Sequence, residues 1–431
     1  ISKGGWAKTS EGLLKVLTNT NTLNYNLGFT DHKIDMVFGQ SIELTDSYAV
    51  ISSNYGFAND YLTFYAPQTA LFNDPDTYRA SSSKLISFFS RVNYTYKNKF
   101  LFTFTGRADG ASKFAENKKF GFFPAFALGY KLSEEKFLKD SKSISSLKLR
   151  LSYGLSGNQA IQPYQSLDQL ASSMTAFGAG GVTEALSPVF YAAQLPNNNL
   201  QWEQSAQTNV GFDLGLLNDR FSVTFDYYIK NTDKLLVVGN RIPAQSGFTS
   251  YTENLGLLAT KGADLGISAQ IFEKSAFKWS LSSTMSVGKT KIKEMGADYI
   301  LSGYNQGWVP GGSQRLIIGD EIGAFFGYKS NGISQFDDFV EFTGLSNDQR
   351  IAKYNANPAA TYTPIKDANG VGVIASRPGQ QLYVDADKNG IINEFDKQVI
   401  GYAQPDFTLG ISNSFSYKNF EMSINVDGQF G

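Results

Sequence analysis

One stretch of the chain alternates strictly between apolar and polar positions. From Leu147 to Leu155 the sequence reads LKLRLSYGL, with an apolar or aromatic residue at every odd position. Successive side chains of a β-strand point to opposite faces, so this segment has one apolar face and one polar face. About ten tilted residues are what a strand needs to cross a bilayer. The pattern therefore predicts a strand in the wall of a transmembrane β-barrel.

Similar segments recur along the chain and predict about a dozen antiparallel strands. Between Ile86 and Tyr96, for example, Ile86, Phe88 and Val92 share one face, while Arg91 and Asn93 share the other. The first thirty residues are polar and give no clear pattern. The predicted strands cover residues 33–44, 86–96, 100–107, 122–132, 147–155, 210–216, 221–229, 263–271, 277–287, 407–417 and 420–426.

Very short and very long connections separate these segments. Asn98 lies in the short connection Lys97–Lys99 and suits a tight turn, because Asn tolerates a positive φ. The long connections cover residues 156–203, 230–259, 288–325 and 330–403. We expect a short helix at Asn347–Asn357 within the longest of them. Outer-membrane barrels combine short periplasmic turns with long extracellular loops, so the connections favour such a barrel over a soluble β-sandwich.

Composition agrees with this class and excludes several others. Aromatic residues make up 14% of the 431 residues, with 34 Phe and 23 Tyr, which suits strands and the aromatic girdles of membrane barrels. No apolar run approaches the roughly 18 residues of a transmembrane helix. The net charge of −1 gives no argument for nucleic-acid binding. Cysteine is absent, and His32 is the single histidine, so a disulfide scaffold and a multi-histidine metal site are both excluded.

Two blocks of sequence resemble a known family. The first combines RVNYTY at 91–96, RADGASKF at 107–114, FPA at 123–125 and LKLRLSYGLSGN at 147–158. The second combines WE at 202–203, QTNVGFD at 207–213, DYYIKNTDKLL at 226–236, NLG at 254–256 and KGADL at 261–265. Together they are similar to the SusC-type TonB-dependent outer-membrane transporters of Bacteroidetes. The family often has Ser at Ala111 and Glu at Asp264, and neither difference affects the fold.

The resemblance implies a 22-stranded barrel that encloses an N-terminal plug. It implies a place in the outer membrane of a Gram-negative bacterium, a SusD-like surface lipoprotein as a lid, and energy supplied by TonB–ExbB–ExbD through the plug. The expected function is import of a glycan or an oligopeptide. Residues 1–431 are expected to form only the later part of the barrel domain, because nothing in them matches a plug. Lys148 and Arg150 are expected to face the lumen, and Leu147, Leu149 and Leu151 the lipid.

Two other functions compete with transport. A SusC-like barrel would look the same if it served as a scaffold subunit of a larger outer-membrane complex. A surface enzyme would need a convergent set of catalytic groups, and the sequence offers none. The pairs Glu134–Glu135 and Asp337–Asp338 are expected to be solvated charges, and the Gly-rich segment 178–181 lacks the Lys-Ser/Thr of a phosphate-binding loop. We therefore predict that the chain is not an enzyme and has no catalytic residues.

Residues 385–396 read DADKNGIINEFD and fit a calcium loop of the EF-hand type. Oxygen ligands are expected at positions 1, 3, 5, 7, 9 and 12 of such a loop, with Gly at position 6, and calcium prefers oxygen. The predicted ligands are Asp385, Asp387, Asn389, the carbonyl of Ile391, Asn393 and Asp396. The last is Asp where a bidentate Glu is usual, which weakens binding. The alternatives are an Asx turn without metal and a calcium ion with a purely structural role.

Three aromatic residues in or beside the long connections are candidate contact residues. Trp202, Tyr304 and Trp308 offer ring faces that would stack on sugars or peptide side chains, or meet a lid protein. The same rings would equally pack one loop on another. The sequence leaves substrate contact, partner contact and internal packing open for these three residues.

Overall fold

The computed structural model describes most of the chain. The described residues are 5–57, 61, 65–74, 76–177, 185–239, 248, 251–273, 276–296, 299–301, 313–366 and 373–431. The chain forms two compact units, residues 1–288 with 409–427 and residues 289–408 with 428–431. Each unit is therefore considered by itself.

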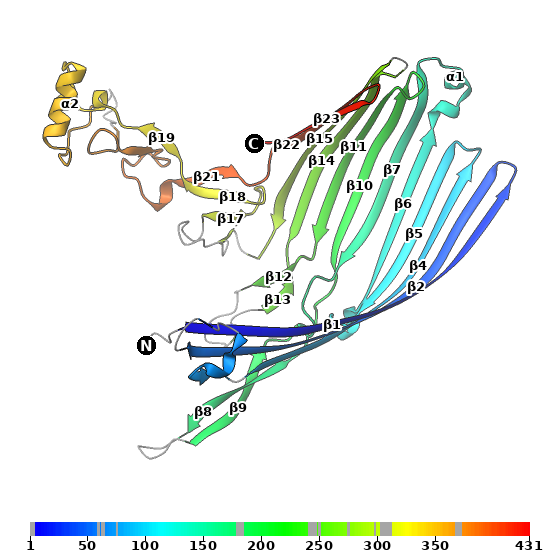
Figure 1. Cartoon of the computed structure of the whole chain (residues 1–431), viewed down its shortest axis with the longest axis horizontal. Helices are drawn as coiled ribbons and strands as arrows, with labels where there is room; N and C mark the ends of the chain where they lie inside the picture. Colours follow the sequence, from blue (N-terminus) through cyan, green and yellow to red (C-terminus); the bar gives the residue numbers. More distant parts are fainter. Residues whose placement is uncertain are drawn as a thin grey trace. The chain divides into compact units, whose positions relative to one another are not determined.

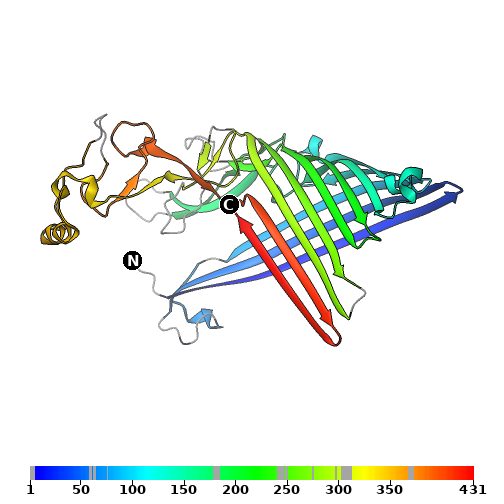
Figure 2. The same ribbon diagram turned by 90° about the horizontal axis from the view of Figure 1, so that it is seen from above.

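A 13-stranded antiparallel sheet dominates the first unit (Figure 1). Neighbours in the sheet follow the chain in the order β1-β2-β4-β5-β6-β7-β10-β11-β14-β15-β22-β23, and β3 pairs with β2. Figure 2 shows the same strands from a second direction. The strands are β1 (Gly5–Phe29), β2 (His32–Phe57), β3 (Phe72–Asn73), β4 (Thr77–Tyr96), β5 (Phe100–Ala111), β6 (Phe120–Lys131), β7 (Ile144–Asn158), β10 (Glu203–Leu216), β11 (Phe221–Asp233), β14 (Leu257–Phe272), β15 (Phe277–Glu294), β22 (Phe407–Tyr417) and β23 (Phe420–Phe430).

Shorter elements occupy the long connections. Two hairpins of the first unit are β8 (Gln169–Phe177) with β9 (Ala185–Gln194) and β12 (Leu236–Gly239) with β13 (Tyr251–Asn254). The one-turn helix α1 (Lys136–Lys139) precedes β7. The second unit contains the four-stranded sheet β16-β17-β18-β21, the pair β19-β20 and the helix α2. Their bounds are β16 (Tyr299–Leu301), β17 (Gln314–Ile317), β18 (Ala324–Tyr328), β19 (Ser330–Ile333), α2 (Asn347–Ala356), β20 (Gln381–Tyr383) and β21 (Lys397–Tyr402). Among the described helices, none is long and apolar enough to span a membrane.

Strand pairing gathers the apolar positions on one face of the sheet and the polar or small positions on the other. We call these the apolar face and the polar face. One row of directly paired residues on the apolar face is Tyr130, Leu149, Phe212, Phe225 and Leu265. The adjacent rows on the polar face are Gly129, Arg150, Gly211, Asp226 and Asp264, and then Lys131, Lys148, Asp213, Thr224 and Gly266. The predicted division of 147–151 between two unlike faces is therefore confirmed.

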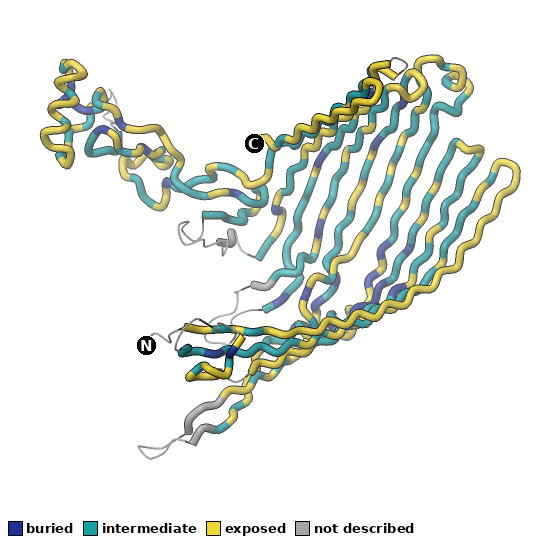
Figure 3. Tube along the Cα trace, viewed as in Figure 1, coloured by how far each residue is buried: buried dark blue, intermediate teal, exposed yellow. Residues whose placement is uncertain are grey.

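The apolar face is open rather than covered by another layer. Leu151 is 44% exposed and Val210 is 52% exposed, although both are in the middle of their strands. Figure 3 shows intermediate and exposed classes along most of the sheet, with few buried positions. A soluble protein rarely leaves so large an apolar surface in water, so this face requires lipid.

An aromatic row crosses the apolar face at the end with the short turns. Ring centroids are 4.9 Å apart between Phe29 and His32, 5.0 Å between His32 and Tyr96, and 4.7 Å between Phe100 and Tyr130. Tyr96 and Phe100 connect the two halves of the row at 6.4 Å. Such a girdle is typical of the boundary between the hydrocarbon and the headgroups. His32 is therefore a half-buried member of this row.

All eleven predicted strands occur in the sheet. The segment Phe407–Tyr417 has the predicted bounds, and several others are longer than the alternation suggested. The helix predicted at 347–357 is α2, which Ser346 caps by accepting a hydrogen bond from the Gln349 N–H. The first thirty residues, which gave no pattern, form the 25-residue strand β1. The long connections contain β8, β9, β12, β13 and the strands of the second unit, none of which was predicted.

Candidate functional site

A compact hydrophobic core anchors the long connections to one end of the first unit's sheet. Its centre is Trp202, which is 5% exposed and packs against Phe114 and Phe123 at centroid distances of 5.0 and 5.3 Å. The Trp202 indole N–H donates to the Lys119 carbonyl at 2.8 Å. The other buried members of the core are Ala111, Ile161 and Leu200. These residues come from the ends of β5 and β7 and the starts of β6 and β10, which meet at one edge because the strands are antiparallel.

The position of Trp202 decides between the readings left open for it. A side chain that is only 5% exposed offers little ring surface to a sugar, a peptide or a lid protein, so the structure places Trp202 in internal packing. The physical reason is that strand pairing brings Phe114 and Phe123 to the same point, which the sequence alone does not reveal. Tyr304 and Trp308 lie outside the described residues.

Hydrogen bonds around this core hold further loops in place. The Asn158 side-chain amide donates to Glu203 at 3.1 Å, and the other carboxylate oxygen of Glu203 accepts from the Leu236 N–H at 3.1 Å. The Asn254 side chain donates to the Gln201 carbonyl at 2.7 Å and accepts from the Gln201 N–H at 2.8 Å. Residues of the motifs SGN, WE and NLG therefore connect strand ends to loops through these hydrogen bonds.

Charged side chains on the polar face form a network across three strands. Arg150 on β7 makes a two-pronged pair with Asp226 on β11, with N–O distances of 2.7 and 2.8 Å. The Arg150 Nη2 also lies 3.0 Å from Asp213 on β10. Gly211 lies directly between Arg150 and Asp226 in the row, so the guanidinium passes over a position without a side chain. The missing Cβ is what allows the two partners to meet across an intervening strand.

Gly211→Ala is expected to destabilise the wall by about 1–3 kcal/mol, the usual cost of overpacking. A Cβ at position 211 would lie 2.4 Å from an Asp226 carboxylate oxygen and 2.5 Å from the Phe225 carbonyl oxygen. The matched control is Gly266→Ala, whose Cβ would have no atom closer than 3.9 Å. Urea unfolding in detergent micelles measures the unfolding midpoint of both variants. An unchanged midpoint for Gly211→Ala would contradict this account.

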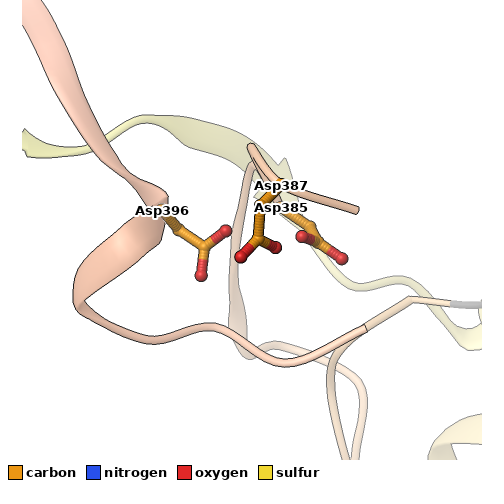
Figure 4. A group of neighbouring side chains, drawn as sticks. All are labelled: Asp385, Asp387 and Asp396. Carbon is orange, nitrogen blue, oxygen red and sulfur yellow. The ribbon is translucent and has the colours of Figure 1, made fainter. Parts of the chain in front are cut away.

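The second unit brings together the three acidic residues of the predicted metal loop. Ligand atoms of Asp385, Asp387 and Asp396 all lie within 4.8 Å of one another (Figure 4). Gly390, at position 6, has a φ of +82°, a conformation that favours glycine, so the loop turns where a calcium loop requires it.

Backbone groups hold each carboxylate of this loop in place. Asp396 is fully buried, and its two oxygens accept from the N–H groups of Ala386 and Asn393, at 2.8 and 2.7 Å. Asp385 accepts from the N–H groups of Asn389 and Gly390, at 3.1 and 2.7 Å. Each carboxylate oxygen has more than one lone pair, so these bonds leave capacity for a cation.

Hydrogen bonding favours the ionised form of Asp385. Desolvation acts to raise the pKa of Asp385, but hydrogen bonds from the Gly390 N–H, with Asp387 and from the Asn389 N–H outweigh it and hold the pKa below its ordinary value. The side-chain oxygens of Asn389 and Asn393 accept from the N–H groups two residues later, at 2.7 and 2.9 Å. The loop therefore combines Asx turns with a preformed set of oxygen donors, and its chemistry fits a hard cation such as calcium.

Comparison with known proteins identifies the family. The family model described as TonB dependent receptor-like, beta-barrel matches residues 5–427. TonB-dependent receptor P3 of Formosa agariphila is 32% identical over 96% of this chain and 39% of its own length. SusC of Bacteroides thetaiotaomicron is 30% identical over 84% of this chain and 32% of its own length. The chain thus spans about two fifths or less of the curated relatives it matches.

A solved structure has the same fold. The RagAB peptide transporter superposes with a TM-score of 0.72 at 19% identity, and the match covers 98% of this chain and 41% of that chain. The predicted class, an all-β antiparallel wall in the outer membrane, is confirmed together with the recognised family. The chain belongs to the TonB-dependent receptor family of outer-membrane β-barrels, as a relative of SusC.

Proposed function

We propose that this chain forms part of the wall of an energy-coupled importer of the SusC and RagA type. The observation that carries the proposal is a wall of strands whose polar face is built of charged, hydroxyl and small side chains, as a polar path requires. Membership in the TonB-dependent receptor family supports it. The proposed cargo is a glycan or an oligopeptide, and the proposed partners are a SusD-like lipoprotein lid and TonB–ExbB–ExbD.

Uptake in cells tests this proposal. Cells that require this protein for growth on a glycan or a peptide are expected to lose uptake of the labelled nutrient when TonB is deleted. Loss of the SusD-like lipoprotein is expected to reduce uptake as well, because the lid would no longer retain the cargo. Uptake that continues unchanged without TonB would overturn the proposal. Stoichiometric co-purification of subunits other than a SusD-like protein would instead support the scaffold role.

We also propose that residues 385–396 hold a calcium ion that stiffens the second unit. The ligands would be the side chains of Asp385, Asp387, Asn389, Asn393 and Asp396 together with the Ile391 carbonyl. The support is the cluster of three carboxylates and the buried position of Asp396. Removing the ion would leave neighbouring carboxylates to repel one another.

Calcium is expected to protect the 385–396 loop from proteolysis by at least several-fold, because binding to the folded loop alone stabilises it. Cleavage is followed in the full-length protein with calcium and with a chelator. The matched variant Asp387→Asn removes one charged ligand and is expected to lose the difference, whereas Glu394→Gln, in the same loop but outside the ligand set, is expected to keep it. Equal cleavage rates with calcium and chelator would refute the calcium proposal.

A further inference from the structure

Two short turns of the first unit place a lysine against an aromatic ring at the end of a strand. The Lys97 Nζ lies 5.3 Å from the ring centroid of Tyr96, in the turn between β4 and β5. The Lys418 Nζ lies 5.3 Å from the ring centroid of Tyr417, in the turn between β22 and β23. Both distances are within the roughly 6 Å of a cation–π contact. Two turns far apart in the chain therefore share one arrangement of side chains.

Both rings belong to the apolar face of the sheet. Tyr96 is a member of the aromatic row at the end with the short turns. Tyr417 shares a face with Ile411 and Phe415, because residues an even number of positions apart along a strand point the same way. Aromatic rings at such a boundary lie at the level of the lipid headgroups. The two ammonium groups next to these rings therefore lie where lipid phosphates lie.

The backbone of these turns does not by itself call for lysine. Lys97 has a φ of +50° and Lys418 a φ of +52°, in the left-handed region that favours glycine and asparagine. Either of those residues would form the turns more easily. A requirement for positive charge at this level accounts for lysine at both positions.

The two lysines are only weakly engaged by the protein. The acid nearest to Lys97 is Asp31, at 3.9 Å, which is longer than a hydrogen bond. Among the residues that the structure describes, none offers Lys418 an acidic partner. Arg220 occupies the equivalent place in the turn between β10 and β11, but its Nε donates to the Gln270 carbonyl at 2.7 Å. Lys97 and Lys418 therefore remain available to an external anion.

Positive charge is concentrated at this end of the sheet. The short connections and the residues next to them contain eleven Lys or Arg and eight Asp or Glu, an excess of three positive charges, whereas the whole chain has a net charge of −1. The residues counted are 30–35, 97–99, 131–143, 217–220, 273–278 and 417–421. A surface with this excess attracts anionic lipids and gives no advantage to zwitterionic ones.

We propose that the short-turn end of the wall binds the headgroups of anionic phospholipids, with Lys97 and Lys418 holding the lipid phosphates. The rings of Tyr96 and Tyr417 would pack against the part of the lipid between the phosphate and the acyl chains. Short turns of outer-membrane barrels face the periplasm, so the lipids are those of the leaflet on that side. The proposal concerns the membrane rather than cargo, and it does not depend on the import function.

Lipid retention by the purified full-length protein tests the proposal. The protein is equilibrated in micelles that contain phosphatidylglycerol and phosphatidylcholine in equal amounts, and the lipids retained after washing are counted by mass spectrometry. We expect phosphatidylglycerol to be enriched, and the enrichment to fall about fivefold for each lysine replaced in the series Lys97→Gln, Lys418→Gln and the double variant. Replacing both lysines by arginine keeps the charge and is expected to keep the enrichment.

The matched control is the double variant Lys84→Gln and Lys261→Gln. It removes the same charge from exposed positions near the opposite ends of β4 and β14, and it is expected to retain lipid like the unmodified protein. Circular dichroism checks that each variant folds. A variant that fails this check is replaced by the corresponding arginine variant, titrated with salt, which is expected to weaken its retention of phosphatidylglycerol.

Three results would overturn the proposal: equal retention of the two lipids, unchanged enrichment in the double variant of Lys97 and Lys418, or the same loss in the control. Inorganic phosphate, added at constant ionic strength, separates the lipid from the free ion. We expect it to leave retention unchanged. Displacement of phosphatidylglycerol by inorganic phosphate would assign the lysines to the free ion and reject the lipid.

Discussion

Trp202→Ala is expected to destabilise the loop end of the sheet by about 3–5 kcal/mol, the usual cost of deleting a buried Trp side chain. The substitution would remove the ring that packs on Phe114 and Phe123 and would leave the Lys119 carbonyl without its donor. The connection before β6 and the connection between β7 and β10 share this core, so they should loosen together. The paired strands of the rest of the sheet should stay folded.

Limited proteolysis of the protein in detergent separates these two effects. Cleavage within 112–119 and 159–201 is expected to accelerate strongly in Trp202→Ala, while the membrane-embedded fragment stays intact. Trp202→Phe keeps the packing and loses only the hydrogen bond, so it should be intermediate. Trp6→Ala is the control, because Trp6 is 68% exposed. Loop cleavage at the same rate in Trp202→Ala and Trp6→Ala would rule out an anchoring role.

Leu151→Arg is expected to cost about 2–4 kcal/mol, the range for a basic residue placed at the lipid midplane of a barrel. Leu151 lies between Leu128 and Val210 on the apolar face and is 44% exposed. Its new charge would have to leave water for hydrocarbon or pull headgroups inward. The next residue, Ser152, points to the polar face, so Ser152→Arg places the same side chain on the opposite side of the same strand.

Folding into lipid vesicles from urea compares the two variants directly. Leu151→Arg is expected to lower the unfolding midpoint and the folded yield, and Ser152→Arg to change both far less. If the two arginine variants behaved alike, or if Ser152→Arg were the worse, the assignment of the two faces would be reversed. Both variants introduce the same residue at neighbouring positions of one strand. A difference between them therefore does not come from the position along the strand or from the β-propensity of arginine.

Local alternation predicted the strands and their faces because the period of two is a property of each strand by itself. Alternation failed for β1 for a physical reason. Leu23, Tyr25 and Leu27 alternate as expected, but Asn19 and Asn21 occupy the same face further along. β1 is 25 residues long, more than twice the roughly 9–11 residues that a bilayer requires. The part of β1 that extends beyond the bilayer does not need an apolar face, so its sequence does not show the alternation of apolar and polar residues.

The clustering of side chains within one loop was predictable, and a network of side chains between strands was not. The spacing of Asp385, Asp387 and Asp396 is local, and the structure brings all three together. The network of Arg150, Asp213 and Asp226 joins positions up to 76 residues apart, so it depends on strand pairing. The feature of the sequence that would have pointed to this network is Gly211, a residue without a side chain on the polar face of β10, between Arg150 on β7 and Asp226 on β11.

The strict division between faces also limits how the chain can change in length. Losing one residue inside β7 would exchange the environments of every side chain beyond that point, placing Lys148 or Arg150 in hydrocarbon. Losing two residues would restore the faces and shorten the strand by one step. An insertion or deletion of one residue is tolerated only where the strand register already shifts, as it does between Gly215 and Leu216. We therefore expect relatives of this protein to differ freely in loop length and to change their strands in steps of two.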